Sequence, residues 1–252
     1  MKDGKAEKSK YHSCGIWLTA SSINHSCLSN VHRSFIGDLQ LIHATCDIPA
    51  DTELAFWYQV PSEDSYEETQ ESLKSWGFAC DCAICLDAKN TPKKLLKKRD
   101  ALCGDLKTTL KNASGIDAAK AEGLLAAIEQ TYDSPPSKIP RLALSYPYLL
   151  VARDYAAQNP AKSVSLALRA LESLGFVIKG ANVPTSSRLP FDVEQWGVMT
   201  DGVIEAWIHL CNAYVTLAPH MAQKAQDCAK IAYRACVGED VTFRETYGET
   251  AK

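Results

Sequence analysis

The chain has 252 residues, a length that suits one large domain or two ordinary ones. Its hydrophobic fraction of 46% and charged fraction of 23% are typical of a globular protein. Its formal net charge of −3 argues against general nucleic-acid affinity, which needs a basic surface. The sequence has neither an apolar run long enough to span a membrane nor the apolar segment of a secretion signal. We therefore expect a cytoplasmic or nuclear protein, or both, with reduced cysteines.

The first 60 residues carry β-strand signals after a charged tail. Residues 1–10 are predicted to be a disordered basic tail. Two β-rich runs, 31–36 and 39–46, flank a Gly-Asp turn and predict a hairpin. A strand is predicted over 53–58, and a helix with acidic early turns over 66–76.

From residue 91 onward, Ala and Leu increase and the apolar residues recur with a helical period. We expect the segment Phe176–Val198 to be an inserted loop and the tail from Gly238 to be loosely held. Six helices are predicted, over residues 92–112, 116–132, 140–158, 160–174, 194–217 and 219–236.

Two helix pairs in this region resemble each other. Tyr155 precedes Pro160 by five positions, and Tyr214 precedes Pro219 by five. The pattern is consistent with two degenerate tetratricopeptide (TPR)-like hairpins, with the inserted loop between them. Generic antiparallel helix packing is the alternative.

Other features of the helical region have structural explanations. The basic run at residues 93–99 is interpreted as a solvated helix face, because Leu95, Leu96 and Leu102 mark a buried stripe beside it. A patch that binds an acidic partner is the alternative. Four cysteines fall in helical patterns and are expected to be small core residues. They are Cys103, Cys211, Cys228 and Cys236.

Cys80, Cys82 and Cys85 form a C-x-C-x-x-C motif. A short turn with this spacing can present three thiolates to a zinc ion, which needs a fourth ligand from elsewhere. Three unrelated buried cysteines are the alternative interpretation.

Three segments in this order resemble one known family. Ile23–Asn30 contains N-H-S-C, Glu53–Tyr58 reads E-L-A-F-W-Y, and Trp76–Cys85 ends in the cysteine motif. Together they resemble the C-terminal half of a SET domain with its post-SET segment. SET domains are protein methyltransferases that use S-adenosylmethionine. The likeness covers residues 11–87 and is closest to the SET/MYND type or to fungal TPR–SET proteins.

The resemblance implies an α+β fold, with a small β-rich SET and post-SET zinc region before an all-α, TPR-like domain. The implied domains begin after the charged tail. The C-terminal half of the SET domain spans 11–66, the post-SET segment 67–90 and the helical domain 91–252.

The resemblance also implies a set of site residues. Cys27 of N-H-S-C would be the fourth ligand of one structural zinc ion; Cys14, Cys46 and His25 are reserve ligands. Four residues would bind the cofactor. Asn24 and His25 would contact it, Phe78 would stack on its adenine, and Tyr58 would bind it and position the methyl group for catalysis.

Phe56 and Trp57 are candidates for the wall of a lysine channel, although Trp17 and Trp57 are expected mainly in the core. The implied substrate is a lysine of a protein, histone or other. The helical domain is expected to limit or recruit that substrate, or another protein partner, with no direct contact to nucleic acid or membrane.

The family also has an N-terminal half with a Gly-x-Gly strand that wraps the cofactor, and we do not find it in this sequence. We therefore expect the chain to bind S-adenosylmethionine weakly or not at all. The competing hypothesis is a non-enzymatic, zinc-stabilised helical-repeat scaffold for protein interaction. A RING-like ligase module is excluded, because such modules bind two zinc ions and only one ligand set is visible.

Overall fold

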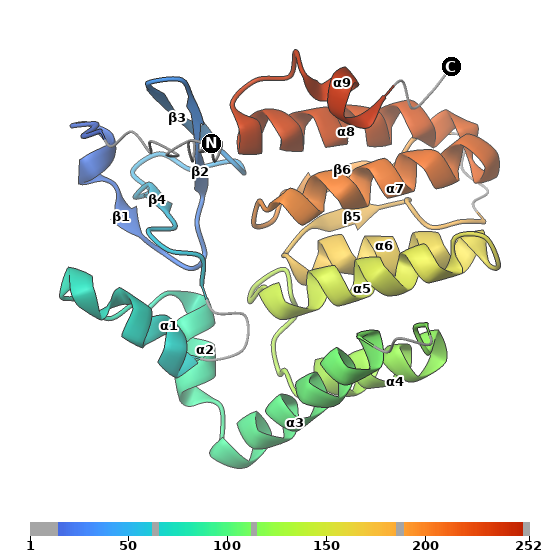
Figure 1. Cartoon of the computed structure of the whole chain (residues 1–252), viewed down its shortest axis with the longest axis horizontal. Coiled ribbons are helices and arrows are strands. Elements are labelled where there is room, and N and C mark those ends of the chain that lie inside the picture. The colour runs from blue at the N-terminus through green and yellow to red at the C-terminus, as the bar shows by residue number, and fades with distance from the viewer. Residues whose placement is uncertain (1–14, 62–65, 112–114, 185–188, 249–252) are drawn as a thin grey trace, which may run out of the picture.

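The computed structural model describes residues 15–61, 66–111, 115–184 and 189–248. Short strands and two short helices gather at one end of the molecule, and stacked long helices form the rest (Figure 1). The predicted tail at residues 1–10 and the reserve ligand Cys14 lie outside the described residues.

Four short strands at the N-terminal end form two small sheets. β2 (Val31–Ile36) and β3 (Leu39–Ala44) pair antiparallel, and the turn between them places Gly37 at φ 57°, where glycine is favoured. The predicted hairpin is confirmed. β1 (Asn24–His25) pairs in parallel with β4 (Ala55–Phe56), which brings the N-H-S-C segment beside the E-L-A-F-W-Y segment.

The strand predicted over residues 53–58 is shorter in the structure, because only two of its residues pair with β1. The N–H of Tyr58 donates instead to His25 Nδ1 at 3.1 Å. The side chain of Asn30 bonds to two peptide groups at the start of the segment. Side chains thus satisfy backbone groups that a longer strand would pair with a neighbour.

Two short helices follow the strands. α1 (Tyr66–Leu73) has two acidic residues in its first turn and continues as the 3-10 turn η2 (Lys74–Trp76). Gly77 ends this turn in the left-handed conformation with φ 76°, which turns the chain toward the cysteine motif. α2 (Ala83–Asn90) begins directly after Cys82.

The remaining helices stack as successive hairpins (Figure 1). Asp117 and Asn159 cap the helices that follow them by accepting backbone N–H groups. Pairing of α5 with α6 and of α7 with α8 is expected of TPR-like and of generic hairpins alike. The bounds are α3 (Lys93–Leu110), α4 (Ala118–Glu129), α5 (Leu142–Tyr155), α6 (Pro160–Ser173), α7 (Asp201–Leu217), α8 (Pro219–Val237) and α9 (Phe243–Tyr247).

The segment Phe176–Val198 is not the plain loop that we expect from its composition. It contains β5 (Val177–Lys179) and β6 (Asp192–Gln195), which pair antiparallel, so the next helix begins at Asp201 rather than at residue 194. Buried aromatic side chains hold the segment in place.

These aromatic side chains surround Trp207 of α7, which is fully buried. The ring of Phe191 stacks on it at 5.4 Å and that of Phe176 meets it edge-on at 6.3 Å. Large aromatic surfaces in the core therefore fix a segment whose Gly, Pro and Ser content suggests a loop.

The expectation of a loose tail from Gly238 is wrong for the described residues. Phe243 of α9 is 1% exposed, and its ring lies edge-on to Tyr233 of α8 at 5.4 Å. The Tyr233 hydroxyl also lies 2.7 Å from Thr242 Oγ1. A few apolar residues thus suffice to dock the tail on α8.

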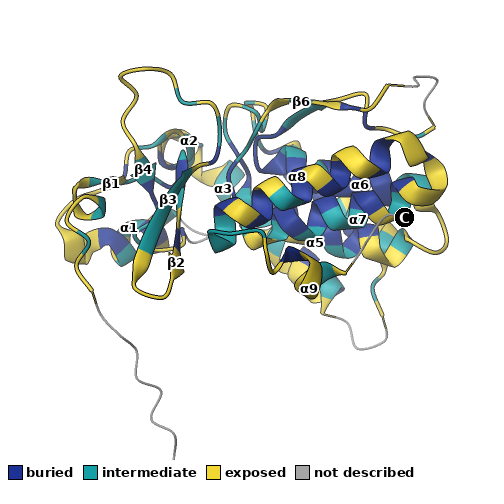
Figure 2. Cartoon of the chain, turned by 90° about the horizontal axis from the view of Figure 1, so that it is seen from above, coloured by how far each residue is buried: buried dark blue, intermediate teal, exposed yellow. Residues whose placement is uncertain are grey.

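Burial differs sharply between the two ends of the molecule (Figure 2). The helical region has a continuous apolar core that runs from Leu106 in α3 to Phe243 in α9. The β-rich region has a small buried cluster, composed of Leu73 and three cysteines, Cys27, Cys80 and Cys85. The α+β fold class with a cysteine-containing β region is confirmed. None of the described helices has the length and hydropathy needed to cross a membrane.

Candidate cofactor and metal site

Four cysteines from separate segments meet in the β-rich region. Cys27 follows β1, Cys80 and Cys82 lie in the turn after η2, and Cys85 belongs to α2. Their Sγ atoms all lie within 4.8 Å of one another. The Sγ of Cys27 is 3.6 Å from that of Cys85 and 3.9 Å from that of Cys80. The structure thus brings Cys27 to the motif more than fifty residues later; Cys46 is not part of this group.

This cluster fits a structural zinc ion. Zn–S bonds of about 2.3 Å in a tetrahedron require sulfur atoms about 3.8 Å apart, and the two separations above lie on either side of that value. Four thiolates leave no coordination position for water, so such an ion would crosslink the chain and not act on a substrate.

The thiols of the cluster influence one another strongly. The hydrogen bond to Cys80 raises the pKa of the Cys27 thiol, whereas the hydrogen bond to Cys27 lowers the pKa of the Cys82 thiol to about 6. Close sulfur atoms therefore share protons when no cation is bound. A divalent cation stabilises all four as thiolates and releases these protons.

Gln70 of α1 holds the cysteine turn in place. Its Oε1 accepts the N–H of Cys80 at 2.9 Å, and its Nε2 donates to the carbonyl of Cys80 at 3.2 Å. The same Nε2 lies 3.4 Å from the Sγ of Cys85, to which it donates. Such contacts orient ligands and stabilise thiolates.

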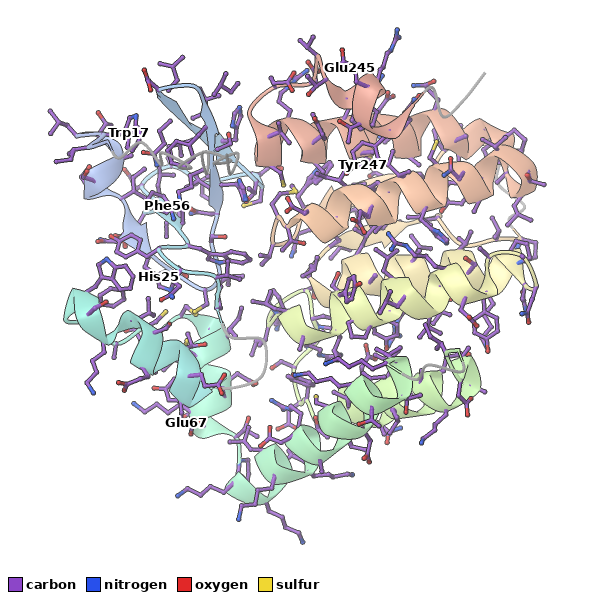
Figure 3. The ribbon with its side chains drawn as sticks, in the orientation of Figure 1. Trp17, His25, Phe56, Glu67, Glu245 and Tyr247 are labelled. Atoms are coloured by element: carbon purple, nitrogen blue, oxygen red, sulfur yellow. The ribbon has the colours of Figure 1, made fainter. Side chains whose placement is uncertain are left out.

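His25 links the cysteine cluster to Tyr58. Its Nδ1 accepts the backbone N–H of Tyr58, so in the neutral ring the proton is on Nε2. Nε2 lies 3.5 Å from the Sγ of Cys27 and donates to it. His25 lies between the strands and α1, next to the sulfur atoms (Figure 3). It orients Tyr58 from one side and a thiolate from the other.

The Tyr58 hydroxyl donates to the carbonyl of Ile23 at 2.8 Å. Its proton is therefore already used, while lone pairs on the oxygen can still accept. Asn24, the next residue, is exposed, and its amide donates to Glu53 Oε1 at 2.6 Å. Tyr58 and the N-H-S-C segment are thus in direct contact.

Tyr58 forms a surface cluster with three other rings, His25, Trp76 and Phe78. We call these four rings the exposed aromatic face. Phe78 meets Tyr58 edge-on at 6.1 Å and His25 at 5.9 Å, and Trp76 lies 5.7 Å from Tyr58. Trp76 is 48% and Phe78 37% exposed. The face can accept a flat ring by stacking.

An open cavity of 350 Å³ adjoins Tyr58 on the side of β2. Phe56 and Trp57, the predicted candidates for a channel wall, line it together with Arg33. The guanidinium of Arg33 lies 5.1 Å from the Phe56 ring and donates to the carbonyl of Tyr58 at 3.3 Å. The Trp57 indole donates to the carbonyl of Cys27 at 2.9 Å, and Trp17 packs edge-on against Phe35, so both rings are half-buried.

Four residues of the site are not singled out by the sequence. Glu53 lies within the E-L-A-F-W-Y segment, which gives a weak signal for its role toward Asn24. The other three act through contacts between distant segments and leave no pattern in the sequence. They are Asn30, Arg33 and Gln70.

Comparison with known proteins relates this site to one family. Residues 2–59 match the family model described as SET domain. A protein named methyltransferase from Gibberella zeae is 38% identical over 247 residues, which are 96% of this chain and 34% of that protein.

Two further relatives match shorter parts of the chain. Histone-lysine N-methyltransferase SET5 of Meyerozyma guilliermondii is 39% identical over 77 residues, 29% of this chain and 16% of that protein. Histone-lysine N-methyltransferase SMYD3 of Mus musculus is 26% identical over 127 residues, 50% of this chain and 29% of that protein. The chain thus spans about a third or less of the length of these relatives.

Proposed function

We propose that this chain forms part of a protein-lysine methyltransferase with S-adenosylmethionine as methyl donor, because residues 2–59 match the SET-domain family model and its relatives are named methyltransferases. The observation that most supports this function is the contact of Tyr58 with the N-H-S-C segment. The Tyr58 N–H donates to His25 of the motif, and the Tyr58 hydroxyl donates to Ile23, the residue directly before the motif.

We assign the cofactor to the exposed aromatic face. When bound, S-adenosylmethionine supplies a methyl group on a sulfonium. Phe78 would stack on its adenine, because more than a third of the Phe78 side chain is exposed beside Tyr58. Asn24 and His25 would contact it from β1, where the exposed amide of Asn24 is held by Glu53.

Tyr58 positions the reacting groups in this proposal and does not act as a base. Its hydroxyl proton goes to the Ile23 carbonyl, which leaves the oxygen free to accept weak C–H···O contacts from a polarised methyl group. Holding such a geometry lowers the barrier of an in-line displacement. The Tyr58 backbone is fixed in turn by His25 and Arg33.

The substrate lysine would enter the cavity beside Tyr58 in its neutral form. The ammonium form has no lone pair with which to attack. The Arg33 guanidinium at the wall of the cavity and the sulfonium of a bound donor both disfavour a second positive charge there, which lowers the pKa of an entering amine.

The four cysteines would bind one structural zinc ion. The ion would tie the post-SET turn to Cys27 and so hold Phe78 beside Tyr58. The names of two relatives point to histone lysines as one substrate class. We therefore propose a histone or another protein as substrate, in the nucleus or the cytoplasm, with the helical region recruiting that substrate or a protein partner.

We expect the 252-residue polypeptide by itself to bind the cofactor weakly, because Trp76 and Phe78 are open to solvent and no described segment covers them. A titration with S-adenosylmethionine to millimolar concentration, followed by aromatic NMR spectra, tests this site. Resonances of His25, Tyr58 and Phe78 should shift. At saturating donor, transfer of labelled methyl groups to core histones should fall at least about tenfold in Tyr58→Phe.

Tyr146→Phe is the matched control, since Tyr146 is exposed in α5, far from the site in sequence and element. It should change neither measurement. An absence of any shift at millimolar cofactor would contradict the proposal and favour the non-enzymatic scaffold. A low-micromolar dissociation constant by calorimetry would contradict the expectation of weak binding alone.

A further inference from the structure

A concentrated group of basic residues lies on α2 and α3 and at the end of α3. Between Lys89 and Lys111 the chain has eight basic and two acidic side chains, a net charge of +6. The rest of the chain has 19 basic and 28 acidic side chains. The overall charge of −3 therefore conceals one segment of the opposite sign, and the argument against general nucleic-acid affinity does not apply to that segment.

Five exposed lysines form what we call the lysine face. None of them makes an ion pair with a residue that the structure describes. They are Lys89, Lys93, Lys94, Lys97 and Lys98.

Many basic side chains elsewhere on the surface are paired with acids. Arg153 binds Glu205 at 2.6 Å, and Lys162 binds Glu122 at 2.7 Å. These pairs make the basic side chains part of a locally neutral surface. The lysine face lacks such compensation, so it presents a continuous positive potential.

Helix geometry aligns these charges. α3 has 18 residues and is therefore about 27 Å long. Lys93 and Lys97 are neighbours along it, as are Lys94 and Lys98, because residues four apart lie on one side of a helix. α3 runs along the edge of the molecule away from β1–β4, with α2 leading into it (Figure 1). The face is thus open to a large partner.

We propose that the lysine face binds the phosphate backbone of double-stranded DNA without reading its sequence. A duplex carries one negative charge per about 1.7 Å of axis, a regular line of charge that a row of lysines can follow. Lysine ammonium groups are compact point charges on flexible stems, so a row of them can follow a line of phosphates whatever the base sequence. DNA binding of this kind is independent of methyl transfer.

The face suits DNA better than an acidic protein. Stable protein interfaces are anchored by buried aromatic or aliphatic side chains. Leu95 and Leu96, which lie between the lysines of α3, are half-buried. The lysine side of α3 therefore offers charge without an apolar anchor.

Fluorescence anisotropy with a labelled duplex of mixed sequence, at salt concentrations between about 50 and 200 mM, tests the proposal. Five phosphate contacts predict a slope of log K against log salt of about −4.5. A variant with glutamine at Lys93, Lys94, Lys97 and Lys98 should reduce that slope by about 3.6 and weaken binding at low salt at least about tenfold. Glutamine preserves helix propensity, and the far-ultraviolet circular dichroism should not change.

The matched control places glutamine at four lysines elsewhere in the structure, none in an ion pair with a described residue, with the same change in net charge. They are Lys120, Lys138, Lys224 and Lys230. This control should retain most of the affinity and slope. Equal losses in both variants, or no affinity of the unmodified chain at about 50 mM salt, would overturn the proposal. So would a poly-glutamate peptide that binds through these lysines while the duplex does not, since that result would indicate an acidic protein partner.

Discussion

The helical region and the β-rich region are stabilised in different ways. Every long helix of the first contributes to one apolar core, in which Trp207, Tyr214 and Leu125 are fully buried. In the second, the buried cluster is largely sulfur, with Leu73 as its main aliphatic member. A small unit with so little apolar core needs a crosslink, and a metal ion in the four-cysteine cluster would supply it.

Removing the metal is the most direct test of this difference in stabilisation between the two regions. We expect a chelator, or Cys27→Ala, to unfold the β-rich region and leave the helices folded, because zinc binding in small cysteine sites contributes about 10 kcal/mol or more. Near-ultraviolet circular dichroism should show the loss of aromatic packing in the β-rich region, and metal analysis the loss of one zinc per chain. Cys46→Ala, a half-buried cysteine of the same region outside the cluster, is the control. A stoichiometry near one that survives Cys27→Ala would remove Cys27 from the ligand set.

The converse test concerns the helical core. Trp207→Ala should destabilise the helical region by about 3–5 kcal/mol, because it removes a fully buried ring packed against Phe176 and Phe191. Denaturant unfolding monitored by far-ultraviolet circular dichroism measures the change. Trp76→Ala, at a half-exposed position of the other region, should leave that transition in place. Equal effects of the two substitutions would mean that the regions do not unfold separately.

A smaller effect, on zinc affinity, is expected from a change at Gln70, which holds the cysteine turn. Gln70→Ala removes three contacts to Cys80 and Cys85 and should weaken zinc binding about 10–100-fold without abolishing it. Competition with a chelator of known affinity measures this. Glu71→Ala, at the exposed neighbouring position, serves as the control. Unchanged affinity in Gln70→Ala would show that the cysteines alone orient the site.

The smallest effect is a pH dependence within the helical region. Burial, with a lesser contribution from Arg153, lowers the pKa of His209 below its ordinary value of 6.5. The unfolded chain then takes up a proton at higher pH than the folded chain. The stabilising contribution is therefore complete above pH 6.5 and is lost as the pH falls toward the lowered folded pKa.

Denaturant unfolding of the helical region at a series of pH values from 8 to 5 checks this. His209→Gln should flatten the decline, and His220→Gln, at an exposed position of α8, should not. A decline of equal slope in His209→Gln would assign the pH dependence to other groups.

Local sequence patterns determined most of the elements of this protein. The Gly37 turn, the acidic start of α1, and Asn159 followed by Pro160 act within a few residues, so they predict the hairpin and the helices directly. The cysteine spacing likewise indicates a metal-binding turn. The place of Cys27 and Tyr58 could be inferred from family resemblance, although no local pattern relates them.

The tertiary structure alone decided what depends on contacts between distant segments. Gln70 meets Cys80 because α1 packs beside the cysteine turn, and Arg33 reaches Tyr58 because β2 lies beside β4. The strands inside Phe176–Val198 and the docked α9 have the same origin, since their composition resembles that of loops and burial against Trp207 or Tyr233 outweighs it. Short-range propensity cannot encode such contacts, because their energy comes from surfaces that only the folded chain brings together.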